Sequence, residues 1–276
     1  MRPISTEGFK APDTVEPGPA PMLQWVKVED LVVDPAYQRL IRDSGRKNVQ
    51  RIAAQFRWSC FAPVVVAPIE GGKYAIIDGQ HRTTAALLAG VASVPCLVII
   101  ADRAEQALAF KAINGSVTKV SRMAMHAAAV VAGEPAAALL QHACAIAEVE
   151  LLRYPIEKAQ QQPGQTMSIQ ACAVSLAQYG RDTLITALQC VTQTGNNVPG
   201  ILSGPVIRAL CAVMDAHKDW RDAGEALFQV FEEIDISSLD DQAGPIAAGR
   251  KGSTRTTILI ELLEKELSQL MDRRAA

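Results

Sequence analysis

Residues 74–83 of this 276-residue chain read Tyr-Ala-Ile-Ile-Asp-Gly-Gln-His-Arg-Thr, and this stretch decides the predicted fold. Tyr74 to Ile77 form an apolar run of strand length. Asp78-Gly79 ends the strand, because this pair is typical of turns. Residues 80–88 then have a helical pattern that closes at Gly90. The sequence therefore predicts a buried strand that passes through one glycine directly into a helix.

Such a joint favours an anion site, and phosphate above all. The first helical turn has backbone N–H groups without partners and the positive end of the helix dipole. Gly79 lets the backbone approach a ligand, Arg82 offers paired donors to phosphate oxygens, and His81 can donate or accept a proton. Asp78 can hold a metal ion, accept a hydrogen bond from a hydroxyl group, or cap the helix. The alternative is a structural joint in which Asp78 caps the helix and Arg82 is solvated.

The neighbouring segments complete a small α/β unit over residues 25–115. Strands are expected at 25–28, 63–67, 74–77 and 94–100, and helices at 48–56, 80–88 and 103–113, the first capped by Asn48. Gln38 and Arg39 follow the turn at Pro35. Arg39 either reaches the same anion or is an exposed turn arginine. Asn114 either faces the site or caps the end of its own helix.

Residues 39–57 carry six basic side chains and a single acidic one, Asp43. The whole chain has a formal net charge of -2, so this segment stands apart from the rest. We interpret its basic face as a candidate DNA or phosphate patch, formed by Arg42, Arg46, Lys47 and Arg51. The alternative is an ordinary solvated helix face.

The second half of the chain has helical patterns only. Residues 168–193 resemble a helix-turn-helix, but the second helix carries no Lys or Arg from Asp182 to Gln193, which favours ordinary packing over DNA reading. Residues 240–252 are expected to form a loop. The final helix has an apolar stripe from Leu259 to Leu270, which either docks on the helical domain or joins two copies.

Composition excludes several classes of protein. Hydrophobic residues are 49% of the chain, which excludes global disorder, and the net charge excludes a wholly basic nucleic-acid binder. The six cysteines include no Cys-x-x-Cys pair and are interpreted as buried thiols in a reducing compartment. The proline-rich start has no signal-peptide pattern, and no apolar run reaches the length of a membrane span. We expect a cytoplasmic protein with no membrane partner.

The order of these signals resembles the ParB/sulfiredoxin superfamily over residues 25–125. The likeness consists of the opening strand, the Pro35 to Arg39 turn, the strand at 63–66, the Tyr74 to Arg82 segment and the helix ending at Asn114. In the ParB branch the box matching residues 79–82 reads Gly-Glu-Arg-Arg and grips the phosphates of CTP. Gln80 and His81 depart from it, and Val117 stands where the family has an arginine. Gln80 also replaces the reactive cysteine of sulfiredoxin, so sulfinic-acid repair is not expected.

The resemblance implies an α+β fold, with a small ParB/sulfiredoxin-like α/β domain followed by an all-α domain. The expected parts are a disordered arm (1–24), the α/β domain (25–120), the helical domain (121–250) and a C-terminal amphipathic helix (251–276). It also implies a nucleoside triphosphate, CTP or ATP with Mg²⁺. The expected nucleotide-binding residues are Gln38, Arg39, Gly79, Gln80, His81, Arg82, Thr83 and Asn114.

The expected function is nucleotide binding with a DNA-associated role, of the phage, plasmid or mobile-element type to which the Asp-Gly-Gln-His-Arg form is similar. One alternative is an enzyme, a nucleotide hydrolase, nuclease or phosphotransferase. Asp78, His81 and Arg82 would then be catalytic and Asp78 would bind the metal. The other alternative is a non-catalytic interaction module that forms a homodimer.

Overall fold

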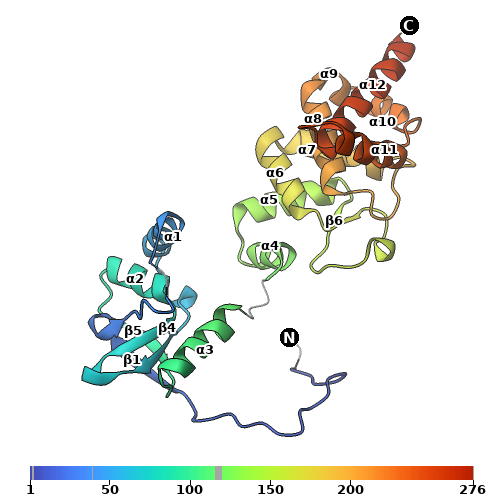
Figure 1. Cartoon of the computed structure of the whole chain (residues 1–276). Coiled ribbons are helices and arrows are strands. Elements are labelled where there is room, and N and C mark those ends of the chain that lie inside the picture. Colours follow the sequence, from blue (N-terminus) through green and yellow to red (C-terminus); the bar gives the residue numbers. More distant parts are fainter. Residues whose placement is uncertain (2, 39, 116–119, 276) are drawn as a thin grey trace. The chain divides into compact units, whose positions relative to one another are not determined.

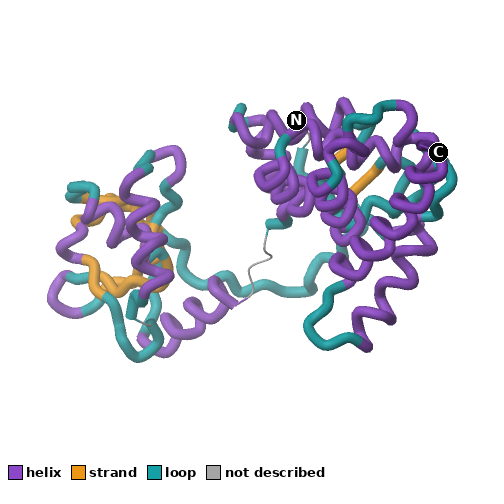
Figure 2. The backbone as a smooth tube through the Cα atoms, turned by 90° about the horizontal axis from the view of Figure 1, so that it is seen from above, coloured by secondary structure: helices purple, strands orange, loops and turns teal. Residues whose placement is uncertain are grey.

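The computed structural model describes residues 1, 3–38, 40–115 and 120–275. The chain divides into two compact units, Met1–Thr118 and Lys119–Ala276 (Figure 1). The described residues before Met22 form no helix or strand, and all of them are exposed. The first unit holds a mixed sheet with three helices, and the second is almost entirely helical (Figure 2). The α+β class predicted from the sequence is thereby confirmed.

The sheet of the first unit has five strands in the order β1-β5-β3-β4-β2. Their bounds are β1 Met22–Lys27, β2 Leu31–Val32, β3 Val64–Pro68, β4 Tyr74–Asp78 and β5 Ser93–Val98. β1 runs antiparallel to β5 and β3 antiparallel to β4, whereas β3 is parallel to β5 and β2 to β4. The order places β4, which leads into the candidate site, between β3 and β2.

Three helices accompany the sheet, namely α1 Asp43–Ala54, α2 Gln80–Leu88 and α3 Arg103–Gly115. α1 packs on α2, and α3 packs against β4. The core consists of alternate strand residues with Phe61 and Ala86, which pack against them. The expected start of α1 was wrong: the helix begins at Asp43, and Asn48 lies inside it rather than at its cap.

The second unit contains nine helices among its described residues and one small parallel pair of strands. The helices are α4 Arg122–Val131, α5 Pro135–Ile146, α6 Ile169–Tyr179, α7 Arg181–Thr192, α8 Gly204–Ala216, α9 Lys218–Arg221, α10 Glu225–Phe231, α11 Ile236–Gly249 and α12 Arg255–Ala275. The paired strands are β6 Glu150–Leu151 and β7 Gln165–Thr166, which the all-α expectation missed.

Helix α7 lies at the centre of this unit. Eight of its twelve residues are buried, from Thr183 to Thr192, and it contacts α5, α6 and α8. A helix enclosed in this way does not offer a face to the major groove of DNA. This burial agrees with the ordinary helical packing that the lack of basic residues favours.

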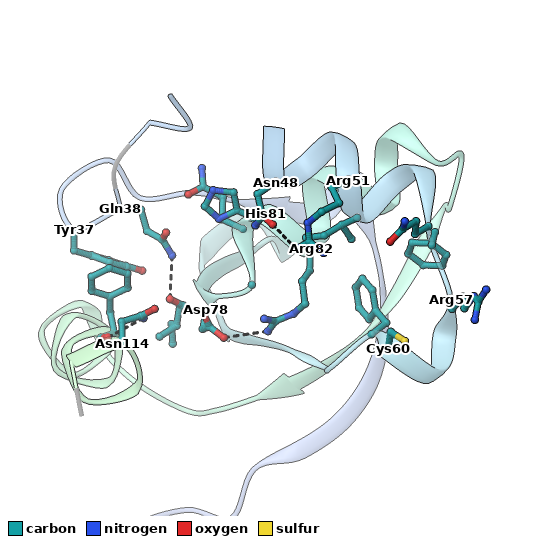
Figure 3. A pocket seen from close by; sticks show the side chains of 18 residues that line it. Tyr37, Gln38, Asn48, Arg51, Arg57, Cys60, Asp78, His81, Arg82 and Asn114 are labelled. Atoms are coloured by element: carbon teal, nitrogen blue, oxygen red, sulfur yellow. Dashed lines mark hydrogen bonds and ion pairs between the residues drawn. The ribbon is translucent and has the colours of Figure 1, made fainter. Parts of the chain in front are cut away.

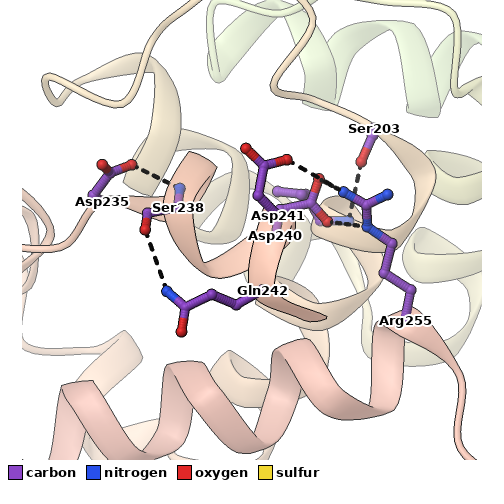
Figure 4. Close-up of polar contacts among 8 residues, drawn as sticks. Ser203, Asp235, Ser238, Asp240, Asp241, Gln242 and Arg255 are labelled. Carbon is purple, nitrogen blue, oxygen red and sulfur yellow. Dashed lines mark hydrogen bonds and ion pairs between the residues drawn. The ribbon is translucent and has the colours of Figure 1, made fainter. Parts of the chain in front are cut away.

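Helix α11 occupies most of the segment that was expected to be a loop, so that expectation was wrong. Gly244-Pro245 in the sequence is typical of a turn, yet Pro245 lies inside α11. The buried Asp240 of α11 accepts two hydrogen bonds from Arg255 of α12, at 2.7 and 2.8 Å (Figure 4). Such a bidentate pair fixes the start of α12 against α11.

The apolar stripe of α12 is used inside its own unit. Leu259, Leu263 and Leu267 are fully buried, and α12 packs on α8 and α11. The stripe is therefore not available as a seam between two copies. Five of the cysteines are buried and free, as expected, whereas Cys60 is exposed.

No single helix within the described residues is long and apolar enough to cross a membrane. The helices α4 and α5 pass the length and composition test only as a pair, and they are bent by 104° at their junction.

Candidate functional site

The joint between β4 and α2 has the geometry that the sequence predicted. Gly79 has φ 107° and ψ 15°, a left-handed conformation in which side chains are strained. A Cβ at Gly79 would lie 3.0 Å from Nη2 of Arg82 and 3.2 Å from Cγ1 of Val64. No side chain caps the start of α2. Its first backbone N–H groups therefore remain available to an anion.

A cavity of about 790 Å³ opens at this joint (Figure 3). That volume lies within the range of roughly 300–1,000 Å³ typical of small-molecule sites. Its walls come from the 37–38 turn, α1, the 55–61 segment, the β4–α2 joint and α3. The lining residues are Tyr37, Gln38, Asn48, Arg51, Ile52, Gln55, Phe56, Arg57, Cys60, Phe61, Ile77, Asp78, Gly79, Gln80, His81, Arg82, Phe110 and Asn114.

Arg82 and Asp78 form an ion pair across the joint, with 3.0 Å between Nη2 and Oδ2 (Figure 3). The same Nη2 also donates to the backbone oxygen of Pro63 at 3.2 Å. These contacts hold the guanidinium against the cavity wall, while its buried Nε atom has no partner among the described residues. The carboxylate of Asp78 is consequently engaged by a cation of its own chain, so a metal ion at this position would have to compete with Arg82.

Gln38 is fixed by the end of β4. Its Nε2 atom donates to the backbone oxygens of Ile76 and Ile77 at 2.9 and 3.0 Å, and its side chain is buried. Both amide hydrogens are thereby used by the protein. Only the side-chain carbonyl oxygen of Gln38 remains for a ligand in the cavity.

The turn that carries Gln38 is tied to α3. Arg103 donates to Asp34 at 2.8 and 3.2 Å, and this hydrogen bond, helped by the backbone N–H of Ala36, lowers the pKa of Asp34. The hydroxyl of Tyr37 donates to Gln106 at 3.3 Å, and burial raises the pKa of that phenol. The aromatic wall that the turn presents to the cavity is therefore anchored at two points.

Asn114 is held by a single hydrogen bond within its own helix. Its Nδ2 atom donates to the backbone oxygen of Phe110 at 2.9 Å, one turn back in α3. The ring of Phe110 lies 5.6 Å from that of Tyr37, so two aromatic rings stand beside the two amides. This end of the cavity combines flat apolar surface with two carbonyl oxygens that accept hydrogen bonds.

Helix α1 supplies the opposite wall. Asn48 and Arg51 line the cavity, and Arg51 donates to Oδ1 of Asn48 at 2.8 Å. Arg57, from the next segment, also lines it. The predicted patch is thus divided: Arg51 belongs to the cavity wall, whereas Arg46 and Lys47 of α1, and Arg42 just before it, are exposed outside the cavity.

The imidazole of His81 packs against α1 at Gly45. A Cβ at Gly45 would lie 2.8 Å from Nε2 of His81 and 2.9 Å from Cγ2 of Ile41. Real side-chain atoms do not approach this closely, so glycine at this position makes room for the imidazole. The position of His81 in the cavity therefore depends on the small size of a residue in α1.

The structure brings most of the predicted residues together. Gln38, Asp78, Gly79, Gln80, His81, Arg82 and Asn114 all line the one cavity. Thr83 does not line it, since this residue is buried beneath the first turn of α2 with its hydroxyl unpartnered among the described residues. Arg39 and Val117 lie outside the described residues.

Several lining residues were missed in the sequence. Tyr37 and Phe110 stand next to predicted residues, Tyr37 before Gln38 and Phe110 one turn before Asn114. Asn48 shares a face of α1, at a spacing of three, with Arg51, which the sequence assigned to the basic patch. These spacings were the available signals, but none of them shows which face of a helix meets the cavity.

Among the residues that the structure describes, no three His, Cys, Asp or Glu side chains are placed to hold a metal ion together. Mg²⁺ commonly binds through one or two carboxylates and the phosphates of its substrate. The cavity suits a cation that arrives with a phosphate ligand better than a resident ion.

The first unit is similar to a known protein family. Residues 26–115 match the family model of the ParB N-terminal domain. No match was found among curated proteins. The truncated ParB of Caulobacter crescentus with CTP-gamma-S aligns at 15% identity and a TM-score of 0.33, covering 80% of this chain and 98% of that one.

Two further solved structures align with the chain. The same Caulobacter crescentus protein with the centromeric parS site has 17% identity and a TM-score of 0.29, covering 76% of this chain and 97% of that one. A Pnob8-like ParB-N domain has 14% identity and a TM-score of 0.29, covering 90% of this chain and 98% of that one.

The family match settles the class of the first unit. A mixed five-stranded sheet, with a strand that turns through Gly79 into α2, occupies the matched segment. Residues 26–115 are therefore a ParB N-terminal domain, within the ParB/sulfiredoxin superfamily that the sequence resembles.

Proposed function

We propose that the N-terminal unit binds a nucleoside triphosphate, with the phosphates at the start of α2, in a protein with a DNA-associated role. The single observation that carries this proposal is the open cavity at an uncapped helix start behind a left-handed glycine. Free N–H groups at such a start favour phosphate oxygens. The guanidinium groups of Arg51, Arg57 and Arg82 and the imidazole of His81 add donors around them.

The other end of the cavity suits a base. Tyr37 and Phe110 offer rings for apolar contact, while Gln38 uses both amide hydrogens, and Asn114 one of its two, on backbone oxygens. The remaining carbonyl oxygens accept hydrogen bonds, so a base with an exocyclic amine fits better than uracil. This supports a base with an exocyclic amine, such as the cytosine or adenine expected from the sequence.

The proposed cofactor is Mg²⁺ bound to the triphosphate. Bound there, it would neutralise phosphate charge and orient the oxygens. Asp78 would be the nearest protein carboxylate at the joint, although its pairing with Arg82 lowers its availability. The residues present fit a cation that is held mainly by phosphate and water.

The DNA-associated role is supported by the family of the N-terminal domain and by the exposed basic side chains of α1. Arg42, Arg46 and Lys47 lie outside the cavity, where contact with a phosphate backbone would not compete with the nucleotide. The phage, plasmid or mobile-element type remains an expectation from the Asp-Gly-Gln-His-Arg form.

The enzyme alternative uses the same cavity. It assigns catalysis to Asp78, His81 and Arg82, yet Asp78 is paired and no cluster of three metal-binding side chains exists among the described residues. Nucleotide binding therefore has the stronger structural support, and turnover of the bound nucleotide would be a further activity of the same site.

Titration calorimetry of the full chain with CTP, ATP, GTP and UTP, each with Mg²⁺, tests the proposal. We expect binding of CTP or ATP, and weaker binding of UTP. Arg51→Ala should weaken binding by roughly tenfold to a hundredfold, because a hydrogen bond to a charged group contributes roughly 1.5–3 kcal/mol. Arg46→Ala on the same helix is the matched control and should leave affinity unchanged. Absence of heat with all four nucleotides at high micromolar protein would refute the proposal.

A further inference from the structure

The two edges of the five-stranded sheet differ in their protection. β2 has two residues, whereas β1 has six, Met-Leu-Gln-Trp-Val-Lys, with one charged side chain and no glycine or proline. None of the described residues pairs with the outer edge of β1. Leu23 is 75% exposed and Trp25 is 62% exposed. Soluble proteins usually shorten or charge such an edge, because it offers free backbone groups to another strand.

The direction of the free backbone groups follows from one hydrogen bond. The N–H of Val28 donates to the oxygen of Ala92 at 2.9 Å, and the register of β1 with β5 continues from that pair. In an antiparallel ladder the inward and outward groups alternate. Gln24 and Val26 therefore bond to β5, while the N–H and C=O groups of Leu23 and Trp25 point outward.

The side chains of these two residues also lie on one face. Leu23 and Trp25 are two apart in the strand, on the face opposite to the buried Val26. Trp58 packs edge-on against Trp25, with 5.3 Å between ring centroids and 76° between their planes. The outward backbone groups and the exposed apolar side chains therefore belong to the same residues.

We propose that the outer edge of β1 binds β1 of a second copy of this chain, antiparallel, about a two-fold axis at Gln24. In that register Leu23 of each copy lies opposite Trp25 of the other, and both residues of the pair have outward backbone groups. Each pair exchanges both backbone hydrogen bonds and packs its side chains on the same face. The edge is thus complementary to itself, as an isologous interface requires.

The surrounding sequence limits this pairing to a short window. Pro21 precedes the strand and has no N–H, so it contributes no donor to the ladder at that end. Lys27 ends the strand at the other side and forms an ion pair with Glu29. A shift of the register by one residue would place the outward backbone groups of one strand opposite inward groups of the other. The register centred on Gln24 is the one that pairs Leu23 with Trp25.

An interface built on one short strand from each copy is small. It falls below roughly 1,000 Å² of total buried area, the range of weak and transient complexes. The dimer is therefore expected to form in the micromolar range and to dissociate on dilution. This prediction concerns the sheet edge and does not depend on nucleotide binding.

Sedimentation velocity of the full chain from about 5 to 500 µM tests the proposal, since that range brackets a weak affinity. The mass should rise with concentration from one copy, 29.6 kDa, toward two. Leu23→Lys and Trp25→Lys should each raise the dissociation constant at least tenfold. Leu87→Lys, at a residue of α2 that is 62% exposed, is the matched control and should not change it.

Amide hydrogen exchange read residue by residue gives a second measurement. On raising the concentration, the amides of Leu23 and Trp25 should become protected, while those of Gln24 and Val26 stay protected throughout. A mass of one copy at every concentration would overturn the proposal, and so would a dimer that survives Leu23→Lys in a folded protein. Protection at another surface, with Leu23 and Trp25 unchanged, would overturn it as well.

Discussion

Nη2 of Arg82 lies 3.0 Å from Oδ2 of Asp78, and the left-handed Gly79 lies between these two residues in the sequence. The pair holds the arginine at the cavity wall and at the same time places a negative charge near the proposed phosphates. These two effects have opposite consequences for an anionic ligand. The hydrogen bond of Asp78 therefore orients Arg82, while the charge of Asp78 repels the phosphates of the ligand.

Asp78→Asn separates these effects. The amide oxygen still accepts from Arg82, but the charge is gone, so affinity for a nucleoside triphosphate should rise by about threefold to tenfold. Repulsion between two charges about 4 Å apart in water amounts to about 1 kcal/mol. Calorimetry measures the change. A tenfold or greater loss of affinity that appears only with Mg²⁺ present would show instead that Asp78 is a metal ligand.

Gly45→Ala should weaken nucleotide binding by about tenfold without unfolding the domain. The new Cβ would displace the imidazole of His81, which lies 2.8 Å from its position, while alanine in a helix interior is favoured over glycine by about 1 kcal/mol. Nucleotide affinity should therefore fall, while the thermal stability of the domain should not. Gly249→Ala in α11, where nothing lies within 4 Å, is the control for a harmless helical substitution. Unchanged affinity of Gly45→Ala would remove His81 from the site.

Gln38→Ala should destabilise the end of β4. It removes two hydrogen bonds to the backbone oxygens of Ile76 and Ile77, which corresponds to roughly 1–3 kcal/mol for buried acceptors left unpaired. Hydrogen exchange of the β4 amides should accelerate accordingly. Gln50→Ala, at an exposed position of α1, should have no effect. Equal exchange rates in both variants would contradict the structural role given to Gln38.

The pair of Asp34 and Arg103 predicts a dependence of stability on pH. The hydrogen bond from Arg103 holds the pKa of Asp34 below its usual value, so its stabilising contribution is full above an unfolded pKa of about 3.9. It is lost as pH falls through the lower pKa of the folded state. Asp34→Asn should therefore be less stable than the parent at pH 7 and equal to it in acid, because asparagine resembles the protonated carboxyl. Urea midpoints across this range provide the measurement, and a constant difference would contradict the account.

Local patterns in the sequence predicted the joint at Gly79 correctly. A run of apolar residues, then Asp78-Gly79, then a helical pattern predicts a strand that turns directly into a helix. The cavity is found where the free N–H groups of that helix were expected. The joint depends on residues that are close in the chain, where spacing is informative. Asn114, which lines the same cavity, was expected there only through the family resemblance.

Other features required the tertiary structure. Tyr37 and Phe110 meet across 73 residues, and no periodicity links them. The face that α1 presents to the cavity, which divides Arg51 from Arg46, depends on how α1 packs on α2. α11 covers most of the segment expected to be a loop, although its Gly-Pro pair is typical of turns, and burial of Leu239, Asp240 and Ala243 overrides that local preference.

The most direct test of the central claim is a crystal structure of the full chain with a nucleoside triphosphate and Mg²⁺. The account predicts phosphate oxygens within hydrogen-bond distance of the backbone N–H groups of Gln80, His81 and Arg82, with the base beside Tyr37 and Phe110. A nucleotide bound elsewhere, or one that leaves the start of α2 in contact with solvent alone, would contradict it.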